Sequence, residues 1–194
     1  MSDRLPLSAP PPMLKEGDAL LVVDVQADFC PGGALPIEAG DAVVPVLNAW
    51  VEAARRAGVP VIASRDLHPG GHPSFTEGGG AWPVHCVQDT PGAAFHHALR
   101  LPAGTVHVAK GTRLDRDQYS AFDETGLAVA LRARGVRRLW VGGLALDVCV
   151  RATVLDALRE GFEVRLIRDG TRPVEPAAGA RALAEMEAAG ARIV

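Results

Sequence analysis

Short runs of consecutive apolar residues recur along the chain, and longer segments with apolar positions three and four apart separate most of them. A continuous apolar run bounded by turn residues is typical of a strand that is buried on both faces, as in a parallel sheet. The pattern therefore predicts six buried strands, at 19–24, 59–64, 105–109, 138–142, 164–167 and 191–194.

The segments with helical spacing each end just before a glycine, the residue expected immediately after a helix. Alternation of strand and helix favours parallel strands joined by right-handed crossovers. We therefore predict a three-layer α/β/α fold with an open, mainly parallel six-stranded sheet, in one domain over 15–194. Residues 1–14 are rich in proline and predict a flexible N-terminal tail. The predicted helices are 41–57, 123–134, 147–160 and 176–189.

The stretch 65–91 is too long and irregular for a simple connection, which indicates a site. It contains one carboxylate and three imidazoles, at Asp66, His68, His72 and His85. Carboxylate and neutral imidazole together suit a borderline divalent ion such as zinc, iron or manganese. The alternative is an ordinary solvated polar loop.

In open parallel sheets, ligands bind beyond the carboxyl ends of the strands. This rule groups Asp24, Asp66 and Lys110 with the turn that leads to Cys149, because all of them follow a predicted strand. Cys149 lies in the first turn of a predicted helix, where the helix dipole and free N–H groups favour an anion. We therefore expect a lowered thiol pKa and a place for an oxyanion. The alternative for Cys149 is a buried packing residue.

A catalytic thiol needs a base, and Asp24 is the candidate, with a pKa raised by burial at its strand end. Lys110 supplies a positive charge that would stabilise a thiolate or carboxylate. Taken singly, Asp24 is also explained as a turn cap and Lys110 as a solvated lysine.

The chain resembles the nicotinamidase branch of the isochorismatase-like cysteine hydrolase family over nearly its whole length, from 19 to 194. The order and spacing of five motifs carry this resemblance. They are Asp24-Val-Gln-Ala-Asp28-Phe29, Arg65-Asp66-Leu-His68-Pro-Gly-Gly-His72, Trp82-Pro-Val-His85-Cys-Val, Lys110-Gly111 and Gly143-Leu-Ala-Leu-Asp-Val-Cys149-Val.

The resemblance implies a catalytic triad of Asp24, Lys110 and Cys149. It also implies a cis peptide between Leu144 and Ala145, so that the N–H groups of Ala145 and Cys149 form an oxyanion hole. This chain departs from the family pattern in having Leu146 where threonine is frequent, and Val148 where an aromatic residue or histidine is frequent.

The resemblance further implies one divalent metal ion, zinc first with iron or manganese as alternatives, held by Asp66, His68 and His85. The residue at the position of His72 is a ligand in some members and not in others. Metal-free relatives lack the Asp-x-His pattern, which favours the nicotinamidase branch. The residues that match the substrate pocket are Phe29, Trp82 and Tyr119.

The expected activity is hydrolysis of nicotinamide, and of pyrazinamide, to the acid and ammonia through a cysteine thioester. The nearest alternative is an amidohydrolase of the same fold acting on another small amide or ureido substrate. More distant alternatives are a hydrolase in which a metal ion activates water and a non-catalytic α/β binding domain. A Rossmann dinucleotide site is excluded because no G-x-G-x-x-G follows the first strand.

Bulk properties limit the partners. The 194 residues carry a net charge of −3 without a basic block, so nucleic acid is not an expected partner. No apolar run approaches the about 20 residues of a membrane span. Three cysteines without a C-x-x-C pair fit free thiols in a reducing cytoplasm. The expected partner is a small-molecule substrate, and both a monomer and a homo-oligomer remain open.

Overall fold

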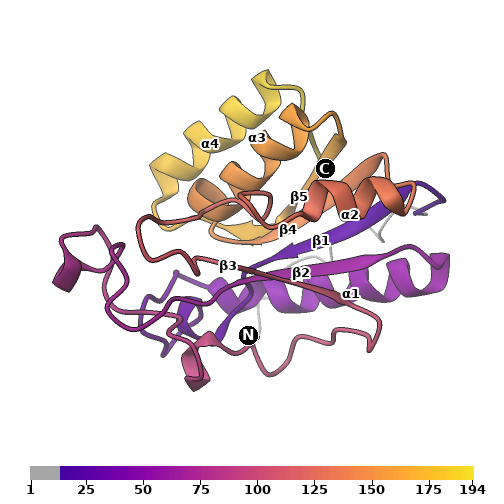
Figure 1. The fold of residues 1–194 in the computed structure, drawn as a ribbon. Helices are drawn as coiled ribbons and strands as arrows, with labels where there is room; N and C mark the ends of the chain where they lie inside the picture. Colours follow the sequence, from indigo (N-terminus) through magenta and orange to yellow (C-terminus); the bar gives the residue numbers. More distant parts are fainter. Residues whose placement is uncertain (1–13) are drawn as a thin grey trace, which may run out of the picture.

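A computed structural model describes residues 14–194, and it contains one six-stranded sheet in the order β3-β2-β1-β4-β5-β6. Every neighbouring pair of strands is parallel, so the predicted fold class is confirmed. The fold is drawn in Figure 1. The strands are β1 (Asp18–Val23), β2 (Val61–Asp66), β3 (Val106–Lys110), β4 (Arg138–Leu144), β5 (Glu163–Arg172) and β6 (Arg192–Ile193).

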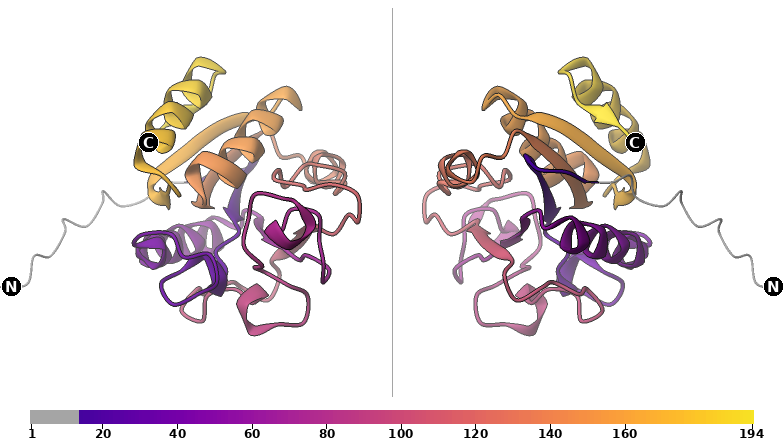
Figure 2. Two further views of the ribbon diagram at one scale, coloured as in Figure 1. Left: turned by 90° about the vertical axis from the view of Figure 1, so that its left-hand side faces the viewer. Right: turned by 90° about the vertical axis from the view of Figure 1, so that its right-hand side faces the viewer.

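Helices cover both faces of the sheet and make three layers (Figures 1 and 2). One face carries α1 alone, whereas the other carries α2, α3 and α4. The strand β1 shows why: its alternate side chains enter opposite cores, Leu20 and Val22 beside α1 and Leu21 and Val23 beside the other helices. The helices are α1 (Val43–Ala57), α2 (Leu127–Ala133), α3 (Arg151–Arg159) and α4 (Pro176–Ala188).

Two predicted helices differ from the observed ones at their N-terminal ends. The helix expected from 123 begins at Leu127, because Glu124 and Gly126 adopt left-handed backbone conformations that a right-handed helix cannot include. The helix expected from 147 is divided into a π-helical turn, Leu146–Val150, and α3. Cys149 lies in this turn, just beyond the carboxyl end of β4.

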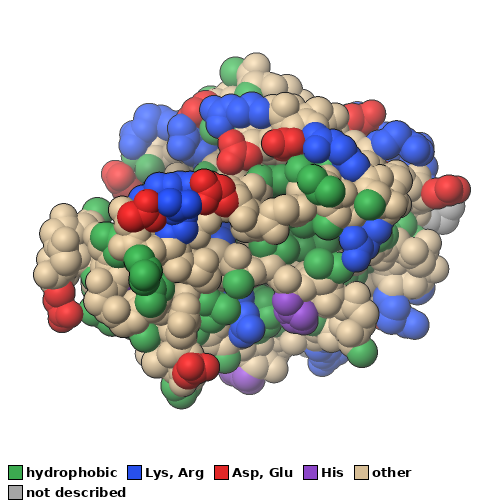
Figure 3. Space-filling model, viewed as in Figure 1, with side chains coloured by type: hydrophobic (Ala, Val, Ile, Leu, Met, Phe, Trp, Pro, Cys, Tyr) green, Lys and Arg blue, Asp and Glu red, His purple; other side chains and the backbone are tan. Residues whose placement is uncertain are grey.

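The predicted tail lies outside the described residues except for Leu14, whose side chain is buried in the core cluster beside α1. Among residues 14–194, every helix is too short or too polar to cross a bilayer. Basic and acidic side chains alternate over the face shown in Figure 3, around a central region richer in hydrophobic groups.

Candidate active site

Three charged or nucleophilic side chains meet at the carboxyl edge of the sheet. Asp24 follows β1, Lys110 ends β3, and Cys149 lies in the π-helical turn after β4. The Lys110 Nζ lies 2.7 Å from Asp24 Oδ2 and donates to Cys149 Sγ at 3.3 Å. Both charged side chains are completely buried, and Cys149 is 5% exposed. The structure thus brings together the acid, the amine and the thiol that the sequence grouped by topology alone.

Asp66, at the end of β2, lies between the strands that carry Lys110 and Asp24. Its Oδ1 accepts a hydrogen bond from Lys110 Nζ, so that one ammonium faces two carboxylates. Oxygen atoms of Asp24 and Asp66 and the Cys149 sulfur lie within 4.8 Å of one another. The buried charges therefore form one network rather than isolated pairs.

The electrostatics of this network give Asp24 and Asp66 different protonation behaviour. Burial raises the pKa of Asp24 to about 6, against the opposing effect of Lys110, which confirms the expectation for this residue. Burial alone would raise the pKa of Asp66 as well, but Lys110 and His68 together hold it below its usual range. Burial tends to lower the pKa of Lys110, whereas Asp24 and Asp66 raise it well above its ordinary value.

The expectation of a lowered thiol pKa is wrong in this structure. Burial raises the pKa of Cys149 well above its usual value, against the opposing effect of Lys110, and the charges of Asp24 and Asp66 raise it further. A helix-start argument considers only the backbone around the sulfur, whereas here the complete burial of the thiol has the largest effect on its protonation. A protonated thiol next to a carboxylate therefore needs that carboxylate as a base.

Two polar side chains that sequence reasoning missed hold the carboxylates in place. Ser64 Oγ donates to Asp24 Oδ1 at 2.7 Å. Gln26 binds the backbone of Asp66 on both sides: its Oε1 accepts from Asp66 N at 2.8 Å and its Nε2 donates to Asp66 O at 2.8 Å. Gln26 and Ser64 are both completely buried. A signal was present for Ser64, since the register of β1 and β2 pairs it with the residue before Asp24.

The turn after β4 surrounds the sulfur with backbone. The peptide between Leu144 and Ala145 is cis, as the resemblance implies. Gly143 has φ of 134°, and a Cβ there would lie 2.0 Å from the Val23 carbonyl oxygen, so this position needs glycine. Asp147, which the sequence left without a role, accepts the N–H groups of Val174 and Glu175 at 2.8 and 3.1 Å. The turn is thereby joined to the start of α4.

The three histidines of the loop after β2 lie side by side and are buried. Each uses its Nδ1: His68 contacts the Gly111 carbonyl at 3.0 Å, His72 the Ser74 hydroxyl at 2.6 Å, and His85 the Pro83 carbonyl at 2.8 Å. Within residues 14–194, the Nε2 atoms of His68 and His72 are buried without a hydrogen-bond partner. A ring fixed through Nδ1 with a free Nε2 is the usual arrangement of a metal-binding histidine.

Donor atoms of Asp66, His68 and His85 lie within 4.8 Å of one another, a spacing that suits ligands around one ion. Burial lowers the pKa of His72 and of His85, which keeps these rings neutral and able to bind a metal. Burial also lowers the pKa of His68, but Asp66 more than compensates and raises it. The residues present therefore fit a divalent metal ion.

Packing brings the three rings together. Phe75, 1% exposed, contacts all three imidazoles edge-on, with centroid separations of 5.3, 5.8 and 5.6 Å to His68, His72 and His85. A Cβ at Gly111 would lie 2.6 Å from the His68 ring, so glycine is required after Lys110. Sequence reasoning did not single out Phe75, whose place between the histidines in the chain was the available signal.

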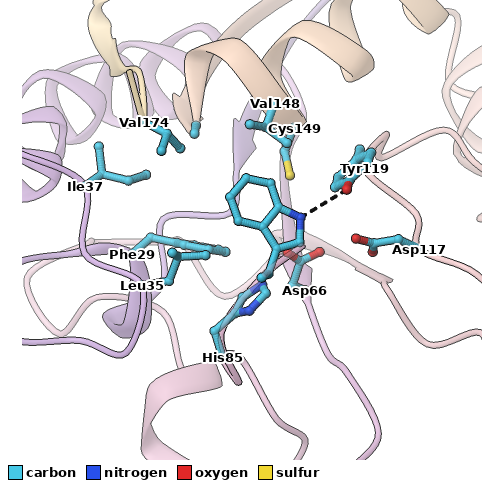
Figure 4. A pocket seen from close by; sticks show the side chains of 12 residues that line it. Phe29, Leu35, Ile37, Asp66, His85, Asp117, Tyr119, Val148, Cys149 and Val174 are labelled. Carbon is cyan, nitrogen blue, oxygen red and sulfur yellow. Dashed lines mark hydrogen bonds between the residues drawn. The ribbon is translucent and has the colours of Figure 1, made fainter. Parts of the chain in front are cut away.

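A pocket opens directly onto Cys149, Asp66 and His85 (Figure 4). The predicted pocket residues Phe29, Trp82 and Tyr119 all line it. The Trp82 indole N–H donates to the Tyr119 hydroxyl at 3.0 Å and links two loops across the pocket. Further lining residues were not predicted, namely Leu35, Ile37, Asp117, Val148 and Val174.

Comparison with known proteins agrees with this geometry. The isochorismatase domain matches residues 18–194. The nicotinamidase of Escherichia coli (strain K12) is 41% identical over 198 residues, covering 90% of this chain and 93% of the relative. The pyrazinamidase of Pyrococcus horikoshii in complex with zinc is 48% identical with a TM-score of 0.89, covering 92% and 98%. PnC1 from L. infantum in complex with nicotinate is 38% identical with a TM-score of 0.87, covering 92% of both chains. The chain belongs to the isochorismatase domain family.

Proposed function

We propose that this protein is a nicotinamidase that hydrolyses nicotinamide, and also pyrazinamide, to the corresponding acid and ammonia. One observation carries the proposal: the buried Asp24–Lys110–Cys149 network and the Asp66–His68–His85 group open onto the same aromatic pocket. The names of the relatives support it, since the E. coli relative is a nicotinamidase and the L. infantum relative binds nicotinate.

Substrate binding depends on the aromatic residues that line the pocket and on the metal-binding residues that open onto it. In the proposal, Phe29 and Trp82 enclose the aromatic ring, and Tyr119 closes the opening. Asp66, His68 and His85 would hold a divalent ion, zinc first with iron or manganese as alternatives, and the ion would supply an electrophilic anchor for the substrate ring that positions the carboxamide near Cys149. The zinc complex of the P. horikoshii relative supports zinc as the ion.

The first chemical step forms the thioester. Asp24 accepts the Cys149 thiol proton while the sulfur attacks the carboxamide carbon, and the carbonyl oxygen becomes the oxyanion. The N–H groups of Ala145 and Cys149 hold this oxyanion, and each such donor is typically worth about 100- to 1,000-fold in rate. Asp24 then gives the proton to the departing nitrogen as the C–N bond breaks. A base with a pKa of about 6 suits both halves of this exchange near neutral pH.

The second step returns the free enzyme. Asp24 takes a proton from water, the hydroxyl oxygen adds to the thioester carbon, and Asp24 returns the proton to the sulfur as the C–S bond breaks, which releases the acid product and restores the thiol. Lys110 lies within contact of Asp24 and Cys149 and balances negative charge on either of them.

Ammonia release tests the proposal. We expect purified protein to release ammonia from nicotinamide and pyrazinamide with a kcat/KM at least about 100-fold above that for ureido substrates of similar size. Alkylation of Cys149 should abolish turnover. Faster turnover of a ureido substrate would assign the chain to another amidohydrolase branch, and full activity after complete alkylation would instead favour a hydrolase in which an ion activates water.

We also propose that the protein works in the cytoplasm. Its three cysteines are all free thiols in the structure, which fits a reducing compartment. A thiol titration of protein isolated under non-reducing conditions that found fewer than three thiols would argue against this.

A further inference from the structure

One acidic residue beside the metal-ligand group has no role in the activity proposed above. Asp117 lies in the loop after β3 and lines the substrate pocket. A carboxylate oxygen of Asp117 and ring nitrogens of His68 and His72 lie within 4.8 Å of one another. In Figure 4 the Asp117 carboxylate points across the pocket toward Asp66.

The Asp117 carboxylate has no basic side chain as a partner among residues 14–194. Its two arginine neighbours in the loop bind elsewhere, Arg113 to Asp115 and Arg116 to Asp123. The hydrogen bond it accepts comes from the backbone N–H of Gln118, at Oδ1. An anion that two adjacent arginines leave unpaired, next to two buried imidazole nitrogens without partners, indicates that a cation belongs there.

The histidines restrict how many ions can bind. His68 has only one free ring nitrogen, because its Nδ1 contacts the Gly111 carbonyl. The ligand group with Asp66 and His85 and the group with His72 and Asp117 both include His68. One nitrogen lone pair binds one ion. The two groups therefore surround a single ion position rather than two.

Charge balance around that position is incomplete without Asp117. Asp66 is the carboxylate in the tight group with His68 and His85, yet its Oδ1 already binds the Lys110 ammonium. A divalent ion there would be held mainly by neutral imidazoles and by a carboxylate whose charge is shared. Asp117 supplies a second negative charge next to His68 and His72.

We propose that Asp117 is a second carboxylate of the metal site, which binds the ion through a water molecule and places its charge between the ion and the substrate pocket. Contact through water is proposed because Asp117 forms a group with His68 and His72 but none with Asp66 or His85, whereas the direct ligands of one ion all lie close to one another. His72 lies beside it as the neighbouring nitrogen donor. This inference rests on the metal site of the proposed function.

Zinc affinity of the full chain tests the inference without an activity assay. Protein stripped with a chelator is titrated with zinc against a chromophoric chelator, for the unchanged sequence and for Asp117→Asn, Glu77→Gln and His85→Ala. Asp117→Asn keeps the shape of the side chain and an oxygen for the Gln118 N–H. We expect it to weaken zinc binding by about 10- to 100-fold, as is usual when a carboxylate in the outer sphere is lost.

Two controls separate the possible outcomes. Glu77→Gln removes an exposed charge from the loop between His72 and His85 and should leave the affinity within about twofold. His85→Ala removes a direct ligand and should weaken binding more than Asp117→Asn does. An unchanged affinity in Asp117→Asn, with a large loss in His85→Ala, overturns the role of Asp117 and leaves the proposed metal site standing. Unchanged affinity in both variants overturns the metal site itself.

The zinc-dependent rise in melting temperature gives a second readout. Asp117→Asn should melt at the same temperature as the unchanged sequence without zinc and gain less when zinc is added, because less ion is bound at a given concentration. Equal gains for both proteins would contradict the inference.

Discussion

The site has two halves that differ in how their polar groups are bonded. The strand-end half contains Asp24, Asp66, Lys110 and Cys149, and the histidine half contains His68, His72 and His85. At the strand ends, the Lys110 ammonium contacts both Asp24 and Asp66, and each of the three belongs to or directly follows a strand of the sheet. In the histidine loop, each ring is fixed by one Nδ1 contact, while the Nε2 atoms of His68 and His72 have no partner. In the first half each charged side chain contacts an opposite charge, with one ammonium shared by two carboxylates, whereas the second half presents nitrogen donors that fit an ion. Asp66 belongs to both halves.

The largest expected effect is the loss of activity when the nucleophile is removed, because it should leave metal binding in the histidine half intact. Cys149→Ala should reduce release of ammonia from nicotinamide by at least about 10,000-fold, because the covalent step is lost. Its zinc content should equal that of the unchanged protein, since the sulfur is not in the group of Asp66, His68 and His85. Steady-state ammonia assays and metal analysis of the same sample measure both. Substantial residual turnover would refute the thioester mechanism.

Lys110→Met should damage the strand-end half in a different way. It removes the cation between two buried carboxylates, and breaking a buried ion pair in this way typically costs about 3–5 kcal/mol in unfolding free energy. Denaturant unfolding at neutral pH measures the loss. Lys15→Met, at the only other lysine of the sequence and an exposed one, is the matched control and should change little. Equal stability of the two variants would show that Asp24 and Asp66 do not depend on Lys110.

Removal of the metal should affect the histidine half alone. After chelation we expect kcat/KM for nicotinamide to fall by at least about 10-fold, mainly through KM, because a positioning group is lost. The rate at which iodoacetamide labels Cys149 should be nearly unchanged, since Lys110 and Asp24 stay in place. If labelling slowed as much as turnover, the two halves would not be independent.

The pH dependence of kcat/KM should follow the ionisation of Asp24 in the strand-end half. Asp24 acts as a base only when ionised, and its pKa is raised to about 6. The kcat/KM should therefore be constant above this value and fall about tenfold per pH unit below it. A profile that stays flat down to pH 4 would mean that Asp24 keeps an ordinary pKa or is not the base.

The sequence predicted which residues meet at the strand ends better than it predicted their pKa values. Asp24 and Lys110 follow continuous apolar runs, and parallel topology alone brings such positions to one edge. His68 and His85 were found from their residue type in an irregular loop. Asp117 was missed because it lies 32 positions after His85, and only the path of the loop after β3 brings it near His72. The thiol pKa was misjudged because it depends first on how deeply the folded chain buries the sulfur, and then on charges from other strands.

The smallest expected effect concerns Ser64, whose hydroxyl donates to Asp24 Oδ1 and lowers the pKa of that carboxyl. Ser64→Ala removes a bond that stabilises the ionised form, so the acidic limb of the kcat/KM profile should move to higher pH. The plateau at alkaline pH should change little, because Asp24 is ionised there in both proteins. Ser120→Ala, at another buried serine that is not bonded to Asp24, should leave the limb in place. A shift to lower pH, or a loss of plateau activity without any shift, would show that Ser64 supports the packing of β2 rather than the charge of Asp24.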